Sequence, residues 1–375
     1  MKQLLIILSL FLFSLTNISC TSTSTTNSDN ETTTDNKTKT DIETTSDNET
    51  TTDNTTTDNT TTSSGLFVAV GWRVYQPDPF CGTRTSCRKY ISKILTSSDN
   101  GSTWNTNSYN EGNLYSIDLI NKILMVRSSK NNNIIYSKDG ISWYYYDNSA
   151  RRSSTRFAYG NGTYLSFDPT GGGIGISYDG ITWEGIPLGF ISEGAYGNKT
   201  FVVGGSSGLF ISTDYGASWN KINSVPGDYI TDIIYANNTF VATNSGGTII
   251  SLDSGVTWTE NSSVSLNSIT YGNSIFVAVG DEGKIITLSD VDMTWTERTS
   301  GTSHNLSQVT YGNGTFVVVG NNPDKGYGNP VYDASSIIRT SDDNGITWKS
   351  KFYSGKDGQT ADGRTNRLGG VAFIE

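Results

Sequence analysis

The sequence predicts an all-β domain built from a seven-fold repeat, because three observations agree. The 375-residue chain contains 40 glycines and 20 tyrosines but only 17% charged residues, a composition typical of short strands joined by tight turns. Seven of its eight tryptophans end similar phrases, which are spaced 36 to 53 residues apart. A short apolar phrase precedes each of them, as at residues 67–71 (FVAVG) and 316–320 (FVVVG).

The overall charge and the reactive residues exclude several classes of function. The net charge of −10 argues against nucleic acid as a partner, because phosphate binding requires a basic surface. The single histidine, His304, excludes a multi-histidine metal site. No dinucleotide-binding, phosphate-loop, calcium-loop or zinc-ligand spacing occurs, so we expect neither a metal nor an organic cofactor.

Residues 1–20 form an export segment. Lys2 precedes an apolar run, residues 4–15, that is too short for a comfortable membrane span, and small and polar residues follow it up to Cys20. The segment resembles a bacterial lipoprotein signal, which implies that Cys20 is acylated and becomes the mature N-terminus. Ordinary secretory cleavage near Cys20 is the alternative. The resemblance implies a location in the cell envelope with the lipid as the only membrane contact, and Thr21 favours the outer membrane or the cell surface.

Residues 21–64 have a different composition, rich in threonine, asparagine and aspartate. They contain one apolar residue, Ile42, and carry nine acidic residues against two lysines. Such a segment buries too little apolar area to offset its conformational entropy, and its like charges repel one another. We expect a disordered stalk between the anchor and a folded head at residues 65–375.

The tryptophan phrases of the head follow the pattern Ser-x-Asp-x-Gly-x-Thr-Trp, as at residues 251–258 (SLDSGVTW). The second and third copies are one residue shorter, and the sixth has Asp292 in place of the glycine. These phrases resemble the Asp-box, or BNR repeat, which occurs in sialidases, in photosystem II assembly factors and in many secreted β-propellers. Its aspartates and tryptophans here are Asp99 and Trp104, Asp139 and Trp143, Asp179 and Trp183, Asp214 and Trp219, Asp253 and Trp258, Trp295, and Asp343 and Trp348.

The chemistry of this phrase is that of a tight turn between two strands. Serine and aspartate side chains bond to the turn backbone, glycine supplies a positive φ, and tryptophan packs a large ring between sheets. We therefore expect these aspartates to be structural and not catalytic.

Each repeat predicts four strands, with the tryptophan phrase between the third and the fourth. The first repeat starts at residues 67–71 without an inner strand, and the chain ends at residues 369–374 (GGVAFI) with an inner-strand phrase that has no partner. Joining these ends predicts a closed seven-bladed β-propeller of four-stranded antiparallel blades, its first blade completed by the C-terminal strand. An open β-solenoid is the alternative. We expect a monomeric head.

Three long connections should gather on the face opposite the tryptophan phrases: residues 72–89, 321–335 and 349–367. They carry ten basic and five acidic residues with interleaved aromatics, which favours binding of an anionic glycan or an acidic protein loop. Solvated loops of arbitrary charge are the alternative. The candidate ligand-binding residues are Trp72, Arg73, Tyr75, Arg84, Arg88, Lys325, Tyr327, Arg364 and Arg367.

Two cysteines lie in the first of these connections. Cys81 and Cys87 are six residues apart, and an exported protein meets an oxidising compartment. We expect a small disulfide that constrains the loop, with a free redox pair as the alternative.

The resemblance to sialidases implies a test for catalysis. A sialidase site combines three arginines, a tyrosine nucleophile assisted by glutamate, an aspartate acid/base and an Arg-Ile-Pro phrase, and residues 72–75 (WRVY) lack the proline. Inner-strand phrases offer mainly apolar residues such as Ile117 and Tyr159, without an evident carboxylate pair. We therefore expect a non-catalytic binding or scaffolding module anchored in the envelope. The alternatives are a diverged sialidase-like glycoside hydrolase or lyase, and an assembly factor that docks envelope proteins.

Overall fold

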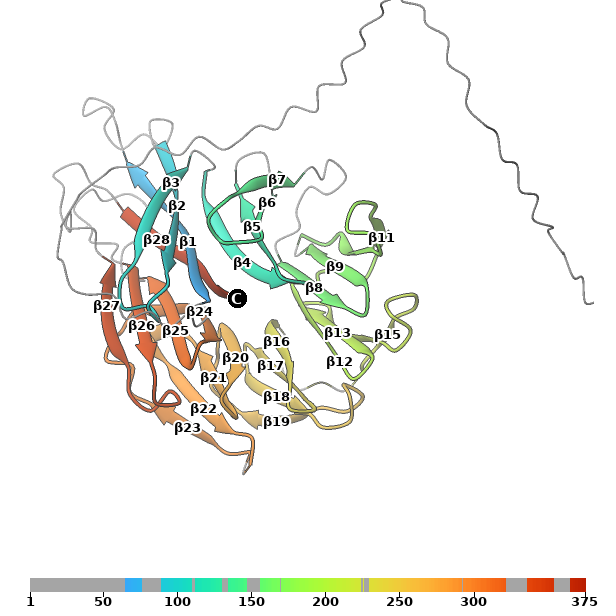
Figure 1. The fold of residues 1–375 in the computed structure, drawn as a ribbon. Coiled ribbons are helices and arrows are strands. Elements are labelled where there is room, and N and C mark those ends of the chain that lie inside the picture. Colours follow the sequence, from blue (N-terminus) through green and yellow to red (C-terminus); the bar gives the residue numbers. More distant parts are fainter. Residues whose placement is uncertain are drawn as a thin grey trace, which may run out of the picture. The chain divides into compact units, whose positions relative to one another are not determined.

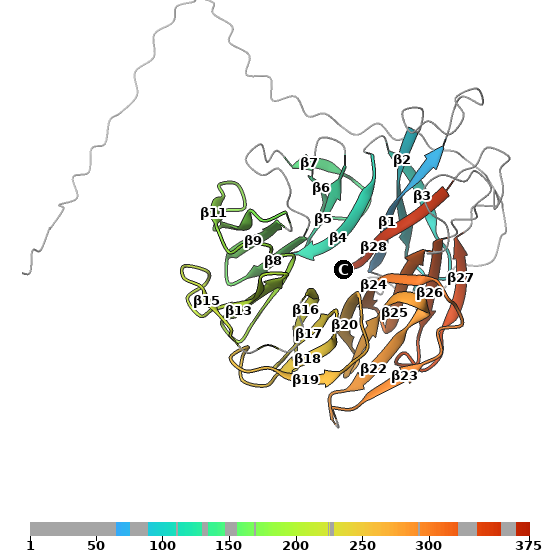
Figure 2. The same ribbon diagram turned by 180° about the vertical axis from the view of Figure 1, so that it is seen from behind.

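Seven four-stranded antiparallel sheets follow one another around a central axis, as Figure 1 and its reverse view in Figure 2 show. No helix among the residues described is long and apolar enough to cross a membrane. The computed structural model describes residues 65–75, 89–109, 112–129, 134–146, 156–168, 170–223, 225, 229–291, 293–321, 336–353 and 365–375.

In blades 2 to 7 the four strands follow chain order from the axis outward, whereas blade 1 takes its inner strand from the C-terminus (Figure 1). One 3₁₀ turn, η3 (Asp281–Gly283), lies in blade 6. The strands are β28 (Thr365–Ile374), β1 (Leu66–Tyr75), β2 (Lys89–Ser97) and β3 (Asn105–Tyr109) in blade 1; β4 (Leu114–Ile120), β5 (Ile123–Ser128), β6 (Ile134–Ser137) and β7 (Tyr144–Tyr146) in blade 2; β8 (Arg156–Gly160), β9 (Thr163–Asp168), β10 (Gly173–Ser177) and β11 (Glu184–Ile186) in blade 3; β12 (Glu193–Gly197), β13 (Thr200–Gly205), β14 (Gly208–Ser212) and β15 (Asn220–Lys221) in blade 4; β16 (Ile230–Ala236), β17 (Thr239–Asn244), β18 (Gly247–Ser251) and β19 (Thr259–Ser262) in blade 5; β20 (Ser268–Gly272), β21 (Ile275–Val279), β22 (Ile285–Ser289) and β23 (Trp295–Arg298) in blade 6; and β24 (Asn305–Gly312), β25 (Thr315–Asn321), β26 (Ser336–Ser341) and β27 (Lys349–Tyr353) in blade 7.

The C-terminal strand closes the ring, which confirms the predicted fold class. Strand β28 pairs antiparallel with β1, with Val68 opposite Ala372, and the C-terminus lies beside the axis (Figure 1). The pairing shifts register between Val70 and Gly71. A side chain on Gly71 would place its Cβ 1.9 Å from the Arg367 carbonyl oxygen, so only glycine permits this approach. An open solenoid is therefore excluded.

Aromatic side chains join neighbouring blades near the axis. The inner-strand tyrosine packs on the phenylalanine that begins the second strand, as Tyr196 does on Phe201 with ring centroids 4.6 Å apart. The same tyrosine covers the glycine of the preceding blade, because a Cβ on Gly160 would lie 2.0 Å from the Tyr196 ring. The tyrosine of one inner strand therefore packs against the glycine of the preceding one. The fully buried phenylalanines at this position are Phe67, Phe201, Phe240, Phe276 and Phe316.

In blades 2 to 7 the hairpin between the first two strands uses a turn that matches strand twist. Both central residues have positive φ, for example 45° at Asn313 and 75° at Gly314, as a two-residue I′ turn requires. The asparagine also bonds the next blade, since Asn313 Nδ2 donates to Asn100 Oδ1 at 2.7 Å. The asparagines of four such turns bond in this way to the tryptophan turn of the next blade.

The tryptophan turns are held by a repeated set of hydrogen bonds. In blade 5, Asp253 Oδ1 accepts from Ser251 Oγ and from the Thr257 N–H, both at 2.8 Å, and Trp258 Nε1 donates to the Gly255 carbonyl at 3.0 Å. Hydrogen bonds from the Thr257 side chain and backbone hold the pKa of Asp253 below its usual value. The structural role expected for the aspartates of this phrase stays a prediction, which their replacement by alanine would test. Equivalent aspartate bonds occur at Asp99, Asp139, Asp179, Asp214 and Asp343.

The indole N–H groups of blades 2 and 5 differ in hydrogen bonding, and this predicts unequal costs for one substitution. Trp258 and Trp143 are both buried, but Trp143, in a shorter turn, has no partner for Nε1 among the described residues. We expect Trp258→Phe to destabilise the head by about 1 kcal/mol more than Trp143→Phe, because only the former loses a hydrogen bond. Urea unfolding of both variants measures the difference, and equal losses would contradict the explanation.

Candidate functional site

Ring closure brings two of the predicted ligand-binding residues together. Trp72 on β1 and Arg367 on β28 are directly opposite each other in the ladder, and Arg73 lies opposite Asn366. Trp72, Arg73 and Tyr75 therefore belong to a strand, and the prediction that they lie in a loop is wrong. The ladder continues beyond the bulge at Gly71, so part of the inserted sequence lengthens β1, β2 and β28. Other predicted residues lie outside the described residues: Cys20, Cys81, Arg84, Cys87, Arg88, Lys325, Tyr327 and Arg364.

Two residues that the sequence prediction missed extend this site. The Trp72 ring meets the Tyr115 ring of β4 edge-on, with centroids 5.3 Å apart. The Arg127 guanidinium of β5 lies over the Tyr115 ring, 5.4 Å from the ring centroid, and Tyr115 is 39% exposed. We call Trp72, Tyr115, Arg127 and Arg367 the aromatic–arginine cluster. It combines exposed ring surface with cations, which suits a ligand that has both apolar and anionic groups.

A sequence signal for Tyr115 existed in the repeat itself. Tyr115 lies four residues before the position of the recurring tyrosine, which is Leu119 in this blade. In blades 4 to 6 this position holds polar residues whose side chains donate to the next blade, such as Thr231 Oγ1 to the Leu266 carbonyl at 2.7 Å. A large, exposed aromatic there departs from the repeat, and such a departure indicates a local function.

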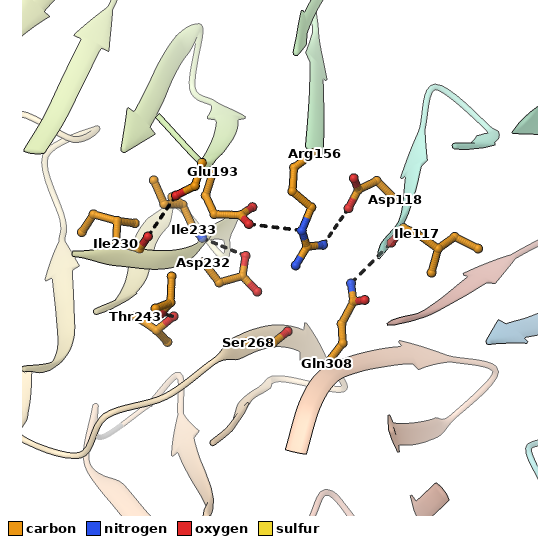
Figure 3. A network of polar contacts seen from close by, with 12 residues as sticks. Ile117, Asp118, Arg156, Glu193, Ile230, Asp232, Ile233, Thr243, Ser268 and Gln308 are labelled. Carbon is orange, nitrogen blue, oxygen red and sulfur yellow. Dashed lines mark hydrogen bonds and ion pairs between the residues drawn. The ribbon is translucent and has the colours of Figure 1, made fainter. Parts of the chain in front are cut away.

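A second polar site lies at the axis and contradicts the expectation of apolar inner strands. The residue three positions before the recurring tyrosine is polar or glycine in every blade, and in Figure 3 several of these side chains point toward one another. The prediction overlooked this position because it compared the apolar residues of the phrase. The seven residues are Ser116, Arg156, Glu193, Asp232, Ser268, Gln308 and Gly370.

Arg156 is the centre of an ion-pair network across three blades (Figure 3). Its Nη1 lies 2.8 Å from Asp118 Oδ1 and its Nε lies 3.1 Å from Glu193 Oε1. These side chains are 13–17% exposed, so a little solvent reaches them. Asp232 adds a third carboxylate that interacts with Arg156 electrostatically. We call Asp118, Arg156, Glu193 and Asp232 the channel cluster, in which one cation faces three carboxyl groups.

The excess of carboxyl groups shifts their protonation. Burial raises the pKa of Asp118, Glu193 and Asp232, and Arg156 only partly opposes this effect. The pKa of Glu193 is raised well above its usual value, because repulsion by the two aspartates adds to burial. Burial lowers the pKa of Arg156, but the three carboxylates outweigh it and the net shift is upward. Arg156 is therefore permanently charged.

Much of this polar ring also bonds one blade to the next. Asp232 Oδ2 accepts from the Ile269 N–H at 3.0 Å. Gln308 Oε1 accepts from the Val371 N–H at 3.2 Å, and a Cβ on Gly370 would lie 2.4 Å from that oxygen. Gln308 thus bonds to the closing strand itself. The axial polar position helps to hold neighbouring inner strands together.

The channel cluster has limited chemical possibilities. Its single arginine is already shared between Asp118 and Glu193, so it offers a substrate carboxylate no free clamp. The remaining carboxyl groups repel an anionic sugar. Within the part of the chain that the structure describes, no three histidine, cysteine or acidic side chains are arranged to hold a metal ion. The arrangement therefore suits a structural ion-pair network better than a sialidase-type site.

The carboxyl groups of the channel cluster and those of the tryptophan turns have opposite pKa shifts, and together they predict that the free energy of unfolding is largest in mild acid. The folded channel cluster binds more protons than the unfolded chain between the ordinary pKa near 4 and its raised values, so stability falls as the pH rises through that window. Turn aspartates such as Asp253 have lowered pKa values, and their contribution is lost as the pH falls below about 4. Urea unfolding from about pH 3 to 8 should show this maximum. Glu193→Gln should reduce the fall in the free energy of unfolding between the maximum and pH 8. A continuous rise in stability to pH 8 would contradict this assignment.

Comparison with known proteins found similarity to solved structures alone. No family model and no curated protein matches the chain. Similar solved structures include YCF48 bound to a D1 peptide (15% identity, TM-score 0.48, 62% of this chain and 85% of that one) and YCF48 from Cyanidioschyzon merolae (15%, 0.46, 67% and 96%). The RRP9 WD40 repeats are also similar (10%, 0.46, 64% and 79%). At these identities and TM-scores the likeness concerns the fold alone, and the seven four-stranded sheets of the chain themselves define a seven-bladed β-propeller.

Proposed function

We propose that this chain is an exported, lipid-anchored binding module whose aromatic–arginine cluster recognises an acidic protein segment or an anionic glycan. The observation that carries the proposal is the edge-on contact of Trp72 with Tyr115, with the Arg127 guanidinium over the Tyr115 ring and Arg367 opposite Trp72 in the ladder. The four residues come from two blades, and Tyr115 departs from the small residues that later blades have at its position. Cations over exposed rings bind anionic groups and the apolar surface next to them.

The position of the cluster supports the same proposal. Long insertions follow β1 and β25 and precede β28, and together with the adjoining strand ends, over residues 72–89, 321–335 and 349–367, they carry ten basic and five acidic residues. The cluster lies at the described ends of β1 and β28, where two of these insertions begin and end. Insertions on a rigid scaffold commonly carry binding function. An acylated Cys20 would anchor the chain with residues 21–64 as a stalk, and the tryptophan phrases would serve as Asp-box turns.

The proposal is tested by retention of the chain on two anionic resins, one carrying a sulfated polysaccharide and one carrying poly-glutamate. We expect Arg127→Ala and Tyr115→Ala to elute at lower salt than the wild-type chain, because each removes a cation or a ring from the cluster. Replacing Arg73, Arg84 and Arg88 together with alanine should abolish retention. Lys138→Ala is the matched control, since Lys138 is an exposed cation in the turn after β6 on the opposite face. Equal elution of all variants refutes the proposal.

One observation keeps a glycoside hydrolase as a second candidate. Glu193 is a buried carboxyl group with a strongly raised pKa, which a general acid requires, and Asp118 lies on the other side of the same arginine. Release of a fluorophore from a panel of fluorogenic glycosides, lost in Glu193→Gln, would favour this candidate. We expect no release, because Arg156 holds both carboxyl groups.

A further inference from the structure

One arginine is buried at a position that the repeat reserves for apolar side chains. Arg339 on β26 is 9% exposed and lies opposite Val318 of β25. The equivalent residues of other blades lie in the core and contact the preceding blade, as Leu95 contacts blade 7 and Ile249 contacts blade 4. Blade 7 therefore places a charged side chain between itself and blade 6, where an aliphatic residue would pack without cost. The equivalent apolar residues are Leu95, Ile135, Phe210, Ile249 and Ile286.

This guanidinium is not compensated by a carboxylate in the described part of the chain. Arg339 Nη2 donates to the Gly301 carbonyl at 2.7 Å, and its Nε is buried without a hydrogen-bond partner among the residues described. No ion pair joins it to a described carboxylate. Burial lowers the pKa of Arg339, and no nearby charge opposes that effect. A buried cation with an unused donor requires an anion, because its desolvation is otherwise unfavourable.

A second arginine faces the same junction from blade 6. Arg298, the last residue of β23, pairs across the strands with Ile285, so their side chains share one face of the sheet. Ile285 packs in one cluster with Ile337 of blade 7, which shows that this face is the one in contact with blade 7. Arg298 Nε donates to Thr287 Oγ1 at 2.9 Å, and the Thr287 methyl group lies 3.0 Å from the Cβ position of Gly345 in blade 7.

The link between the two blades completes the surroundings of these arginines. Residues 299–304 connect β23 to β24, and within them Gly301 is exposed and supplies the carbonyl that Arg339 binds. A Cβ on Gly301 would lie 3.8 Å from Arg339 Nη1, so this link covers the guanidinium with the smallest possible residue. Within the link, Ser300 Oγ donates to the Thr302 carbonyl, and the Thr302 hydroxyl bonds to His304 Nδ1. The junction therefore places one arginine on each of the two facing blades, with the link beside Arg339.

We propose that the junction of blades 6 and 7 binds an oxyanion, such as sulfate, phosphate or a carboxylate, between Arg339 and Arg298. The anion accepts hydrogen bonds from the unused Nε of Arg339 and from the Arg298 guanidinium, and it neutralises the buried charge. This site is separate from the aromatic–arginine cluster, and neither proposal requires the other. Two guanidinium groups provide the planar, paired donors that oxyanions bind best.

Thermal unfolding of the full chain at constant ionic strength tests the site, with sodium sulfate, sodium phosphate or sodium acetate replacing sodium chloride. We expect sulfate or phosphate to raise the Tm of the wild-type chain by about 3 °C or more near saturation. A rise with acetate alone would assign the site to carboxylates. Arg339→Leu restores the residue type of the repeat, so we expect it to fold, to match or exceed the wild-type Tm in chloride, and to lose the shift. Arg298→Gln should lower the affinity of the chain for the anion by about tenfold or more.

The controls separate a built site from a general effect of salt. Lys138→Met removes one exposed cation far from the junction and should keep the full shift. Calorimetric titration of the wild-type chain with sulfate measures binding without any variant. The proposal is overturned if no oxyanion binds the wild-type chain, or if Arg339→Leu retains the shift. It is also overturned if Arg339→Leu is less stable than wild type in chloride, since a carboxylate of the chain itself would then already pair with Arg339.

Discussion

Removal of residues 365–375 is expected to abolish cooperative unfolding of the head. The deleted strand buries Leu368, Val371 and Ile374 almost completely. Each such side chain contributes about 1.5–3 kcal/mol, so their loss approaches the whole stability of a typical domain. The deletion also leaves β1 as an open edge and removes the Phe373 ring that covers Gly312 of blade 7.

Calorimetry of the truncated chain provides the measurement for this prediction. The wild-type chain should show one cooperative transition, and the truncated chain should show none. Addition of a synthetic peptide of residues 365–375 should restore the transition in proportion to its concentration, because the ladder with β1 can reform. Deletion of Glu375 alone, which lies beyond β28, is the control and should have little effect. A cooperative transition in the truncated chain without the peptide would contradict the role given to β28.

The second large effect is expected at the axis. Arg156→Met removes the only cation of the channel cluster and leaves Asp118 and Glu193 buried without their partner. Breaking a buried pair in this way typically costs about 3–5 kcal/mol. The loss should be smaller in mild acid, because the carboxyl groups, whose pKa values are already raised, then become neutral.

An exposed ion pair of the same chain serves as the control for this experiment. Lys284 and Glu297 lie 2.9 Å apart, and Glu297 is 69% exposed at its side chain. Lys284→Met should cost less than about 1 kcal/mol, since water screens such a pair. Urea unfolding near pH 7 and near pH 5 compares the two variants. Similar small losses at both sites would contradict the account of a buried network.

The architecture could be predicted from the sequence because each blade repeats the same local chemistry. A tryptophan phrase marks one turn, an asparagine turn marks another, and an apolar phrase marks the second strand. These signals are local, so the number of blades follows by counting them. The closure by β28 follows as well, since an inner-strand phrase was present at 369–374 and missing before residue 67.

The polar sites could be predicted only in part, because their residues come from different repeats. Trp72 and Arg367 were found through the inserted sequence around them, whereas Tyr115 and Arg127 lie in strands of ordinary length. The carboxyl groups of the channel cluster are far apart in the sequence: a register alignment of the inner strands brings Arg156, Glu193 and Asp232 to one level, and Asp118 lies two residues beyond that level. Arg339 was missed for a related reason, since one charged residue within an apolar strand departs from the repeat only when all blades are compared at that position.

Hydrogen exchange of the wild-type chain, free and bound to poly-glutamate or to the sulfated polysaccharide, tests the central claim that the aromatic–arginine cluster is the binding surface. We predict slower exchange at the amides around Trp72, Tyr115, Arg127 and Arg367 in the bound state, with unchanged exchange in the tryptophan turns. Protection confined to those turns, or to the inner strands around Arg156, would contradict this claim.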